Sequence, residues 1–493
     1  MINIPEVKLG VIAVSRNCFP KELSSRRCKA LVSEIGKKGV SVFTADTIVE
    51  NEIDALAALK EAADAGVNAL VVYLGNFGPE GPETLIAQKF GGVTMYVAAA
   101  EETGSDLING RGDAYCGLLN TSYNLKLRGV KAYIPENPVG TAEELAAEVA
   151  VFENIARVIV GLSQFKIFSF GPRPFDFVAC NAPIKPLYDI GVEIQENSEL
   201  DLYAAFNAHA NDSRIDGIVA EMEQELGAGN KHSGVLRRLA QYEATLLDWA
   251  EENKGASKYF AFANKCWPAF QTQFGFVPCY VNGRLAARGI PVACETDIYG
   301  ALTEYIITLA TLTPPALLDI NNTVPKDLFE EFKGVTKDYA LSDLFMGFHC
   351  GNGSSCYLKD PKMGYQLIMK RALEPDSEPD ITRGTLEGDI KAGDITVFRL
   401  QTSADCKLKS YIAQGEILDM PSKSFGTIGV IAIPEMARFY RHILVGGNYP
   451  HHAGIAFKPS GKVFYEVLKL LGVTDIGYNQ PKGILYPHEN PFK

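Results

Sequence analysis

The first third of the chain alternates short, continuously apolar runs with longer stretches in which apolar positions recur every three or four residues. Continuous apolar runs predict buried strands, and the longer spacing predicts helices that cover them. The predicted strands are 8–14, 40–45, 69–75 and 93–99, and the predicted helices are 23–39, 52–66 and 143–162. This alternation indicates βαβ units and a parallel sheet that is covered on both faces.

The same alternation starts again near residue 166. A strand is predicted at 166–171, another within 257–267, where it runs into a loop, and a short buried strand within 288–294. The helical stretches are 201–226, 235–255 and 298–310. This pattern predicts a second α/β domain.

From about residue 350 the apolar positions alternate with a period of two, and Gly, Pro, Asp and Ser separate the runs. The alternating runs are 394–402, 407–418 and 427–433, and helices are predicted at 434–444 and 461–472. Such alternation predicts an antiparallel sheet or a small barrel. The expected fold is therefore α/β, with two parallel-sheet domains and a C-terminal antiparallel, β-rich, barrel-like domain. The expected domains are 1–165, 166–350 and 351–493.

Composition narrows the classes of function. A chain of 493 residues with a net charge of −12 and no long basic run is not typical of a nucleic-acid-binding protein, which presents a basic face. No apolar stretch reaches the roughly 20 residues that a membrane span needs. Residues 1–17 lack the pattern of a signal peptide, so we expect a cytoplasmic protein. The motifs GxxxxGKS/T, GxGxxG and GxSxG are absent, which disfavours P-loop nucleotidases, dinucleotide-binding enzymes and nucleophile-elbow hydrolases.

The ten cysteines are scattered along the chain without a CxxC pair. The spacing in CGNGSSC, residues 350–356, matches no common zinc motif. We expect free thiols in a reducing compartment, with Cys180 and Cys294 acting as small buried hydrophobes.

Two carboxylates stand out because they follow predicted strands. Glu295 follows VAC, and Asp319 follows PPALL. The carboxyl ends of parallel strands are where α/β folds build their sites, so we expect these two side chains to lie close together. Two neighbouring carboxylates need a cation between them or a proton on one of them. The alternative is that each carboxylate caps the following helix, and Asp297 is expected to be a helix cap or a residue that supports the site.

Three of the seven histidines lie in glycine-rich loops. His349 lies in GFHCGNG, and His451 and His452 lie in GGNYPHHAG. Glycine lets the backbone approach a ligand closely. Two carboxylates with one or two imidazoles and open positions suit an oxygen-preferring divalent ion such as Mn²⁺. The other four histidines fit surface or satisfied core positions: His209, His232, His442 and His488.

Several of these segments together resemble the L-fucose isomerase and L-arabinose isomerase superfamily. The segments are 10–27, 168–177, 267–306, LLDINN at 317–322, FHCGN at 348–352 and GGNYPHHAG at 446–454. The resemblance runs over nearly the whole chain and keeps the order of the motifs. It implies two Rossmann-like domains, a β-rich third domain, and trimers or hexamers in which a neighbour's first domain closes the site. It also implies the interconversion of aldoses and ketoses with Mn²⁺, although other divalent ions are possible.

The resemblance also implies roles for individual residues. In the fucose isomerase pattern the metal is held by a Glu, an Asp 24 residues later and a late His, which correspond to Glu295, Asp319 and His452. Glu295 and Asp319 would then also be the catalytic acid and base that move a proton between C1 and C2 of the open-chain sugar. His349 matches a ligand in only one branch of the superfamily. The expected substrate contacts are Arg16, Phe77, Trp267, Gln271, His349, Asn448 and His451.

Some alternatives stay open at this point. Trp267 also fits a core position, Arg173 is expected in a structural ion pair, and Arg16 and Phe77 are expected to reach a neighbouring subunit's site. A hydride shift could use the same metal as a proton transfer. A non-catalytic sugar-binding protein and a metal-dependent aldolase or epimerase are the competing functions. The identity of the monosaccharide is not fixed by these residues.

Overall fold

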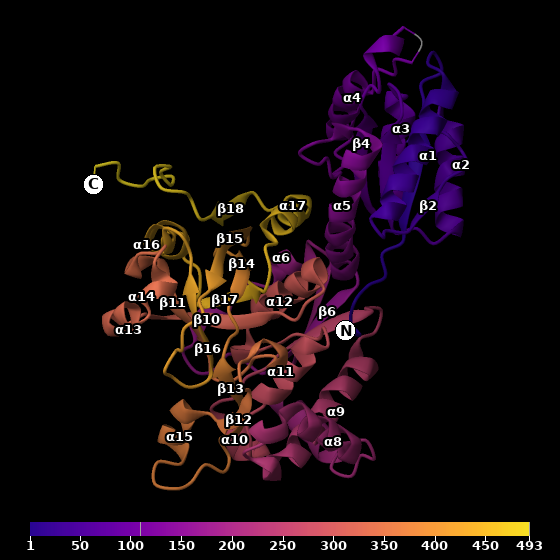
Figure 1. Ribbon diagram of the computed structural model, residues 1–493. Coiled ribbons are helices and arrows are strands. Elements are labelled where there is room, and N and C mark those ends of the chain that lie inside the picture. Colours follow the sequence, from indigo (N-terminus) through magenta and orange to yellow (C-terminus); the bar gives the residue numbers. More distant parts are fainter. Residues whose placement is uncertain (109, 493) are drawn as a thin grey trace. The chain divides into compact units, whose positions relative to one another are not determined.

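The computed structural model describes residues 1–108 and 110–492, which fall into two compact units (Figure 1). One unit consists of Pro5–Gly161 with Lys469–Gly472. The other consists of Met1–Ile4, Leu162–Leu468 and the chain from Val473 onward. We call them the N-terminal unit and the main unit. No helix within the described ranges is long and apolar enough to cross a membrane.

The N-terminal unit is built on one parallel sheet in the order β2-β1-β3-β4-β5. Its strands are β1 (Leu9–Val14), β2 (Val42–Thr44), β3 (Ala69–Leu74), β4 (Val93–Ala99) and β5 (Val139–Gly140). Its helices are α1 (Lys21–Lys37), α2 (Glu52–Asp64), α3 (Glu80–Phe90), α4 (Ala114–Leu127) and α5 (Ala142–Leu162). Every residue of β1, β3 and β4 is buried, as expected for strands covered on both faces. The Asn51 side chain caps α2 by accepting hydrogen bonds from the Ile53 and Asp54 amides.

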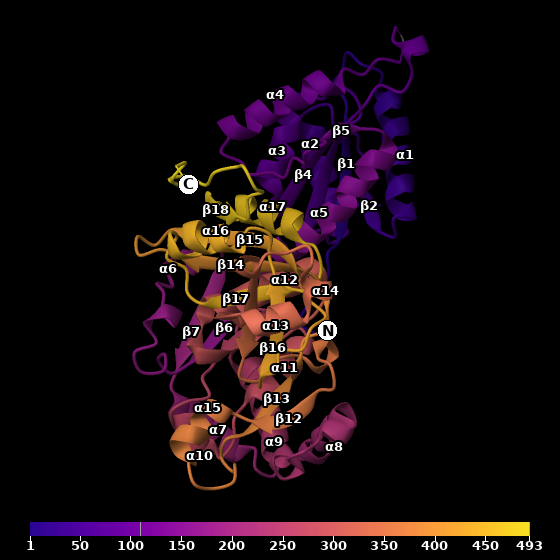
Figure 2. The same ribbon diagram turned by 60° about the vertical axis from the view of Figure 1, so that its left-hand side comes forward.

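The main unit begins with a second parallel sheet in the order β7-β6-β8-β9. Its strands are β6 (Phe165–Phe170), β7 (Val192–Asn197), β8 (Tyr259–Ala263) and β9 (Val292–Ala293). The helices of this part are α6 (Lys185–Tyr188), α7 (Glu199–Ala208), α8 (Ile215–Leu226), α9 (Leu236–Asn253), α10 (Ala269–Phe274), α11 (Cys279–Ala287) and α12 (Ile298–Thr311). Helix α12 contacts strands β8 and β9 of this sheet. It also contacts strands β14 and β17 of a second sheet, and Figure 2 shows it beside these two strands. Because both sides of α12 are covered, nearly all of its residues are buried.

The second sheet of the main unit has nine strands in the order β12-β13-β16-β11-β10-β17-β14-β15-β18 and is mostly antiparallel. The strands are β10 (Ala316–Thr323), β11 (Leu344–His349), β12 (Lys362–Tyr365), β13 (Arg383–Asp389), β14 (Gly393–Thr402), β15 (Leu408–Ile417), β16 (Thr427–Ala432), β17 (His452–Ala456) and β18 (Asp475–Tyr478). The remaining helices are α13 (Lys326–Glu331), α14 (Lys333–Thr336), α15 (Leu367–Leu373), α16 (Met436–Phe439) and α17 (Gly461–Leu471). A further pairing of β15 with β16 closes the strands from β16 through β11, β10, β17 and β14 to β15 into a ring. The ring is the barrel-like feature that the period-two pattern predicts.

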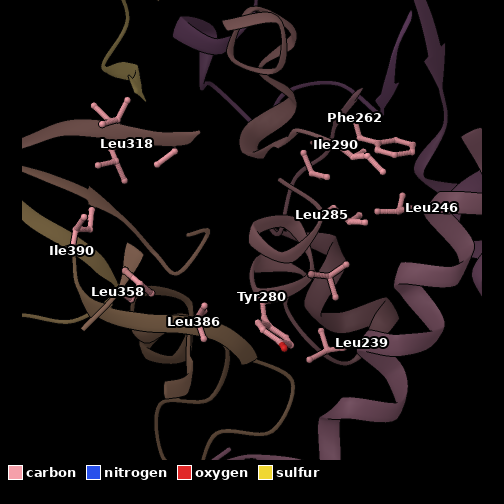
Figure 3. Close-up of a cluster of buried hydrophobic side chains, with 14 of the residues drawn as sticks. Leu239, Leu246, Phe262, Tyr280, Leu285, Ile290, Leu318, Leu358, Leu386 and Ile390 are labelled. Carbon is pink, nitrogen blue, oxygen red and sulfur yellow. The ribbon is translucent and has the colours of Figure 1, made fainter. Parts of the chain in front are cut away.

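One hydrophobic cluster joins the two sheets of the main unit. Figure 3 shows side chains from α9 and α11, such as Leu246 and Leu285, in the same cluster as Leu318 of β10 and Leu386 of β13. All four are essentially inaccessible to solvent. Burial of this apolar surface holds the two sheets together, because each fully buried Leu contributes roughly 1.5–3 kcal/mol.

The structure confirms the predicted fold class, two parallel-sheet α/β parts followed by a β-rich part. One expectation about the site is wrong. Asp319 does not end a strand of the second parallel sheet, because it lies within β10, which pairs antiparallel with β11 and β17. An apolar run such as PALL predicts a buried strand but does not reveal which sheet the strand joins. The division into three domains stays a prediction.

Candidate metal centre

Glu295 lies at the carboxyl end of β9, in a 3₁₀ turn formed by Cys294–Thr296. Both Glu295 and Thr296 have φ 60°, in the left-handed region that residues other than glycine rarely adopt. Strained backbone of this kind persists only where the surrounding structure holds it, and it gathers at functional sites. The turn presents the Glu295 side chain at the sheet edge.

Strand pairing brings the second carboxylate to a histidine. In the register of β10 and β17, Asp319 lies directly opposite His452. On the other side of β10, Asp319 pairs with Phe348, the residue before His349. Three residues from distant parts of the chain therefore meet on three adjacent strands.

Four side chains converge at this point. His452 Nε2 lies 3.3 Å from Glu295 Oε2 and 3.5 Å from Asp319 Oδ1. His451 Nε2 lies 3.9 Å and 3.7 Å from the same two oxygens. Two overlapping groups could hold a metal ion, Asp319 with both histidines, and Glu295 with His452 and Cys180.

A buried ion pair holds the ring of His452 from behind. His452 Nδ1 lies 2.8 Å from Asp297 Oδ2, and Arg399 makes two hydrogen bonds of 2.6 Å and 2.9 Å to the same carboxylate. Asp297 also accepts a hydrogen bond from the Gly300 amide and so caps α12, which explains its place in the sequence. The contact at Nδ1 fixes the orientation of the imidazole and directs Nε2 toward Glu295 and Asp319.

Two buried imidazole nitrogens at this cluster have no hydrogen-bond partner within the described residues. His452 Nε2 is buried without a hydrogen bond of acceptable geometry, and so is His349 Nδ1. The two imidazole rings are 6.2 Å apart, centroid to centroid. A buried polar atom without a partner is costly and calls for an explanation such as an ion or ligand. Imidazole nitrogens and carboxylate oxygens are donors that divalent ions accept, so the residues present fit a metal ion.

The pKa values of the cluster diverge. Burial, and then the nearby Glu295 carboxylate, raise the pKa of Asp319 to about 7. Burial would also raise the pKa of Glu295, but the adjacent imidazole of His452, which is positively charged when protonated, holds it below its usual value. Although burial opposes it, contacts with Asp297, Cys180 and Glu295 raise the pKa of His452. Burial lowers the pKa of both His349 and His451 to about 4, so both rings are neutral near pH 7. The carboxylates of Glu295 and Asp319 therefore stabilise a positive charge beside His452 Nε2, either a proton on the imidazole or a bound cation.

The loop after β6, residues 171–180, contributes contacts that the sequence did not indicate. Cys180 Sγ lies 3.7 Å from Glu295 Oε2 and 3.8 Å from His452 Nδ1, so this thiol faces the cluster and the expectation of a merely hydrophobic role is wrong. The Phe177 ring packs edge-on against His451 at 5.3 Å and against Trp267 at 5.9 Å. Phe177 therefore links Trp267 to the histidine pair. Cys294 is buried as expected, in a small cluster with Cys266, Cys279 and Val277.

The other predicted contacts are placed differently. Gln271, in α10, is fully buried, and neither polar atom of its side chain has a partner. The Asn448 backbone has φ 55°, and within the described ranges its side chain makes no hydrogen bond to the cluster. Arg16 and Phe77 belong to the N-terminal unit, where the guanidinium lies 4.7 Å from the ring centroid. The prediction that these two residues reach a neighbouring subunit stays a prediction.

Arg173 contradicts an expectation. Within the described residues it makes no ion pair, although a structural ion pair was expected, and its Nε is buried without a hydrogen-bond partner. The carboxylates that flank its loop have other partners: Glu199 pairs with Lys265 at 3.0 Å, and Asp297 pairs with Arg399.

A third group of possible metal ligands, His209, Asp212 and Asp248, has a different character. The guanidinium of Arg214 bonds to both carboxylates, and His209 Nε2 lies 2.9 Å from Asp248. Because Arg214 already supplies the positive charge there, the group is an ion-pair network of the surface.

Comparison with known proteins identifies a family for the chain. Residues 10–163 match the family described as "Fucose/sulfoquinovose isomerase, N-terminal domain", and residues 347–477 match "L-fucose isomerase, C-terminal domain". The chain is 26% identical to a sulfoquinovose isomerase of Alkalicoccus urumqiensis over 321 residues, which cover 62% of this chain and 65% of that protein. It is 22% identical to a sulfoquinovose isomerase of Priestia aryabhattai over 65% of this chain and 66% of that protein. A sulfoquinovose isomerase of Clostridium sp. (strain MSTE9) is 31% identical over 35% of this chain and 33% of its own length.

Each of these matches spans slightly less than two thirds of the relative's length, or less. From the two family matches and these relatives we conclude that the chain belongs to the fucose isomerase-like superfamily.

Proposed function

We propose that the protein is a metal-dependent aldose–ketose isomerase, an intramolecular oxidoreductase that acts on an open-chain monosaccharide. The observation that carries this proposal is the convergence of Glu295, Asp319 and His452, with the buried Nε2 of His452 left without a partner between the two carboxylates. The names of the relatives, sulfoquinovose isomerases, support the same class of reaction.

Glu295, Asp319 and His452 would hold the ion, and His451 or His349 could complete the set. We propose Mn²⁺, because oxygen-rich sites with one or two imidazoles suit it, whereas a closed zinc site would favour thiolates. When bound, such an ion polarises the carbonyl group of the sugar and stabilises the negative charge that develops on its oxygen.

Carboxylates of this chain would move the proton between C2 and C1 of the sugar. A C–H bond next to a carbonyl is a weak acid, so its removal needs a base at the carbon atom. Glu295 and Asp319 lie within 3.5 Å of the same imidazole nitrogen, so both carboxylates can reach one small substrate. We propose that they take the proton from C2 and return it at C1, by way of an enediol. Asp297 and Arg399 would act only by holding His452 in place.

The remaining contacts would orient the sugar. Trp267 and Phe177 supply aromatic faces that suit the C–H side of a sugar. Gln271 is buried with both polar atoms free, which suits the recognition of hydroxyl groups. His349 and His451 would contact the sugar from the metal side, and Asn448 is a further candidate from the same glycine-rich segment.

We also propose a cytoplasmic homo-oligomer, a trimer or hexamer, with Arg16 and Phe77 reaching a neighbour's site. The support is a ridge on α4, which we define as Tyr115, Leu119, Tyr123 and Leu127. These side chains are between 64% and 72% exposed and lie four residues apart, so they share one helix face. A contiguous exposed apolar stripe of this kind marks an interface, here with a second copy of the chain.

An isomerisation screen tests the proposal. The protein with Mn²⁺ would be incubated in D₂O with aldoses and ketoses, sulfonated sugars first, and followed by NMR. A ketose formed with deuterium at C1 supports the proposal, and Glu295→Gln should abolish its formation. Isomerisation without deuterium would point either to a hydride shift or to a proton that the base transfers without exchange with the solvent. Cleavage, epimerisation without carbonyl movement, or binding without any conversion would contradict isomerase activity.

A further inference from the structure

Cys180 differs from the other buried cysteines of the main unit in what its sulfur contacts. Its Sγ lies 3.7 Å from Glu295 Oε2 and 3.8 Å from His452 Nδ1. Three other buried cysteines lie together in a separate cluster: Cys266, Cys279 and Cys294. Cys180 therefore places a sulfur atom beside two of the proposed metal ligands.

The spacing of these three side chains fits one small ion. A tetrahedral ion with bonds of about 2.3 Å to sulfur and about 2.0–2.1 Å to nitrogen or oxygen holds its ligand atoms about 3.3–3.6 Å apart. Glu295 Oε2 lies 3.7 Å from Cys180 Sγ and 3.3 Å from His452 Nε2. Ligand atoms of the three residues, one from each, all lie within 4.8 Å of one another. Cys180, Glu295 and His452 therefore approach the arrangement of three ligands around one ion.

A buried nitrogen without a partner points to an ion at the same place. His452 is fully buried, and within the described ranges its Nε2 has no hydrogen-bond partner. The contact between Nδ1 and Asp297 holds the ring, so Nε2 is directed toward Glu295. An ion bound to Nε2 removes the cost of leaving this nitrogen unpaired.

The two ligand sets that share His452 differ in the ions that they prefer. Asp319 and His451 offer oxygen and nitrogen atoms, which suit Mn²⁺, whereas the thiolate of Cys180 is a soft ligand that suits Zn²⁺. Zn²⁺ also binds more tightly than Mn²⁺ in the general order of affinities of divalent ions. Because both sets need His452, one ion excludes the other.

We propose that Cys180, Glu295 and His452 form a second ligand set, which binds a thiophilic ion such as Zn²⁺ in competition with Mn²⁺ and so inhibits the enzyme. This inference rests on the proposed metal centre and isomerase function. On binding, the Cys180 thiol releases its proton to the solvent, and its sulfur forms a bond to the ion. The ion then occupies His452 and the proposed catalytic carboxylate of Glu295, so Mn²⁺ is displaced.

Cd²⁺ serves as the probe of the sulfur–metal bond, because a cadmium–thiolate bond has a charge-transfer band in the ultraviolet. One equivalent of Cd²⁺ is added to the wild type, to Cys180→Ser and to the control Cys356→Ser, which changes an exposed cysteine of the same unit. We expect the band in the wild type and in Cys356→Ser, and its loss in Cys180→Ser. Circular dichroism checks that the variants are folded, and Cys180→Ala takes the place of Cys180→Ser if the latter is not. A band of equal strength in all three proteins would overturn the inference.

A competition experiment measures the preference between the two ions. The protein is loaded with Mn²⁺ and titrated with Zn²⁺, and the released Mn²⁺ is measured by electron paramagnetic resonance. Loss of an outer partner of a metal ligand costs about 10- to 100-fold in affinity, so loss of a ligand should cost at least about 10-fold. The Zn²⁺ concentration that releases half of the Mn²⁺ should therefore be at least about 10-fold higher in Cys180→Ser. Release at the same Zn²⁺ concentration in both proteins would overturn the inference and leave the Mn²⁺ centre intact.

These outcomes separate the inference from the proposed function. A cadmium–thiolate band that depends on Cys180 supports the inference even if no sugar is isomerised, and that failure would overturn only the proposed function. A wild type that isomerises sugars with Mn²⁺ but shows no cadmium–thiolate band would overturn only the inference.

Discussion

His452 Nδ1 lies 2.8 Å from Asp297 Oδ2, and this contact joins a candidate metal ligand to a buried ion pair with Arg399. The contact determines how the imidazole is oriented, since its other nitrogen, Nε2, points between Glu295 and Asp319. Asp297 itself is fixed by Arg399 and by the start of α12. The candidate metal centre is thus tied to the core of the main unit.

Replacing Asp297 should therefore weaken metal binding although Asp297 is not a proposed ligand. We expect Asp297→Asn to lower the affinity for Mn²⁺ by about 10- to 100-fold, because the neutral amide orients His452 less firmly and no longer increases its basicity. Titration calorimetry with Mn²⁺ measures the effect. Asp189→Asn, which changes an exposed aspartate of the same unit, is the matched control. An affinity for Mn²⁺ that is the same in Asp297→Asn and Asp189→Asn would contradict the supporting role.

The ion pair itself should contribute strongly to stability when one partner is removed. Arg399 and Asp297 are both almost completely buried. Arg399→Met should lower the free energy of unfolding by about 3–5 kcal/mol, since it leaves a buried carboxylate without its cation. Denaturant unfolding measures this value. Arg237→Met, which breaks an exposed pair with Asp216, should cost less than about 1 kcal/mol. The double variant Asp297→Asn/Arg399→Met should lose less free energy of unfolding than the two single variants lose together. Strictly additive losses would show that the two residues act independently.

Metal affinity should rise with pH. The raised pKa values of Asp319, about 7, and of His452 mean that both side chains hold protons in mildly acidic solution. These protons must leave before the side chains can bind a cation, so affinity is lowest at acidic pH and the contribution of Asp319 levels off above about pH 7. Calorimetry from about pH 5.5 to about pH 8, in buffers of different ionisation enthalpy, counts the protons released. An affinity that is equal at both ends of this range would contradict the assignment of Asp319 and His452 as ligands.

The α4 ridge should hold copies of the chain together. A charge in the middle of an apolar interface is costly to bury, so Leu119→Arg should shift the protein toward the monomer. Analytical ultracentrifugation over a range of concentrations measures the shift. Ile53→Arg, at an exposed position of α2 outside this ridge, serves as the matched control. If Leu119→Arg assembles like the wild type, the interface lies elsewhere.

The sequence predicts the fold class because the strands of both parallel sheets are continuous apolar runs, for example in β3 and β4. The position of Glu295 at the end of a short buried strand can also be predicted from the sequence, because it depends only on neighbouring residues. The sequence does not reveal the sheet to which Asp319 belongs, because strand pairing is a long-range property and the pairing with His452 spans more than a hundred residues. Local periodicity carries no information about such partners.

Two further residues of the site differ in how clearly the sequence indicates their roles. Arg399 follows Ile395 and Val397 on the inward face of β14, and a charged residue at such a position was a signal for a buried ion pair. Cys180 offered no comparable signal. Its thiol faces Glu295 only because the loop after β6 folds back on the site, and its neighbours in the sequence suit a hydrophobic cysteine equally well.

The most direct test of the central claim is the stoichiometry of Mn²⁺ binding, measured by electron paramagnetic resonance for the wild type and for Asp319→Asn. We expect one tightly bound ion per chain in the wild type and a large loss of affinity in Asp319→Asn, with circular dichroism showing that the variant is folded. A wild type that binds no Mn²⁺ or other divalent ion, or an Asp319→Asn variant that binds it equally well, would contradict the assignment of Glu295, Asp319 and His452 as a metal centre.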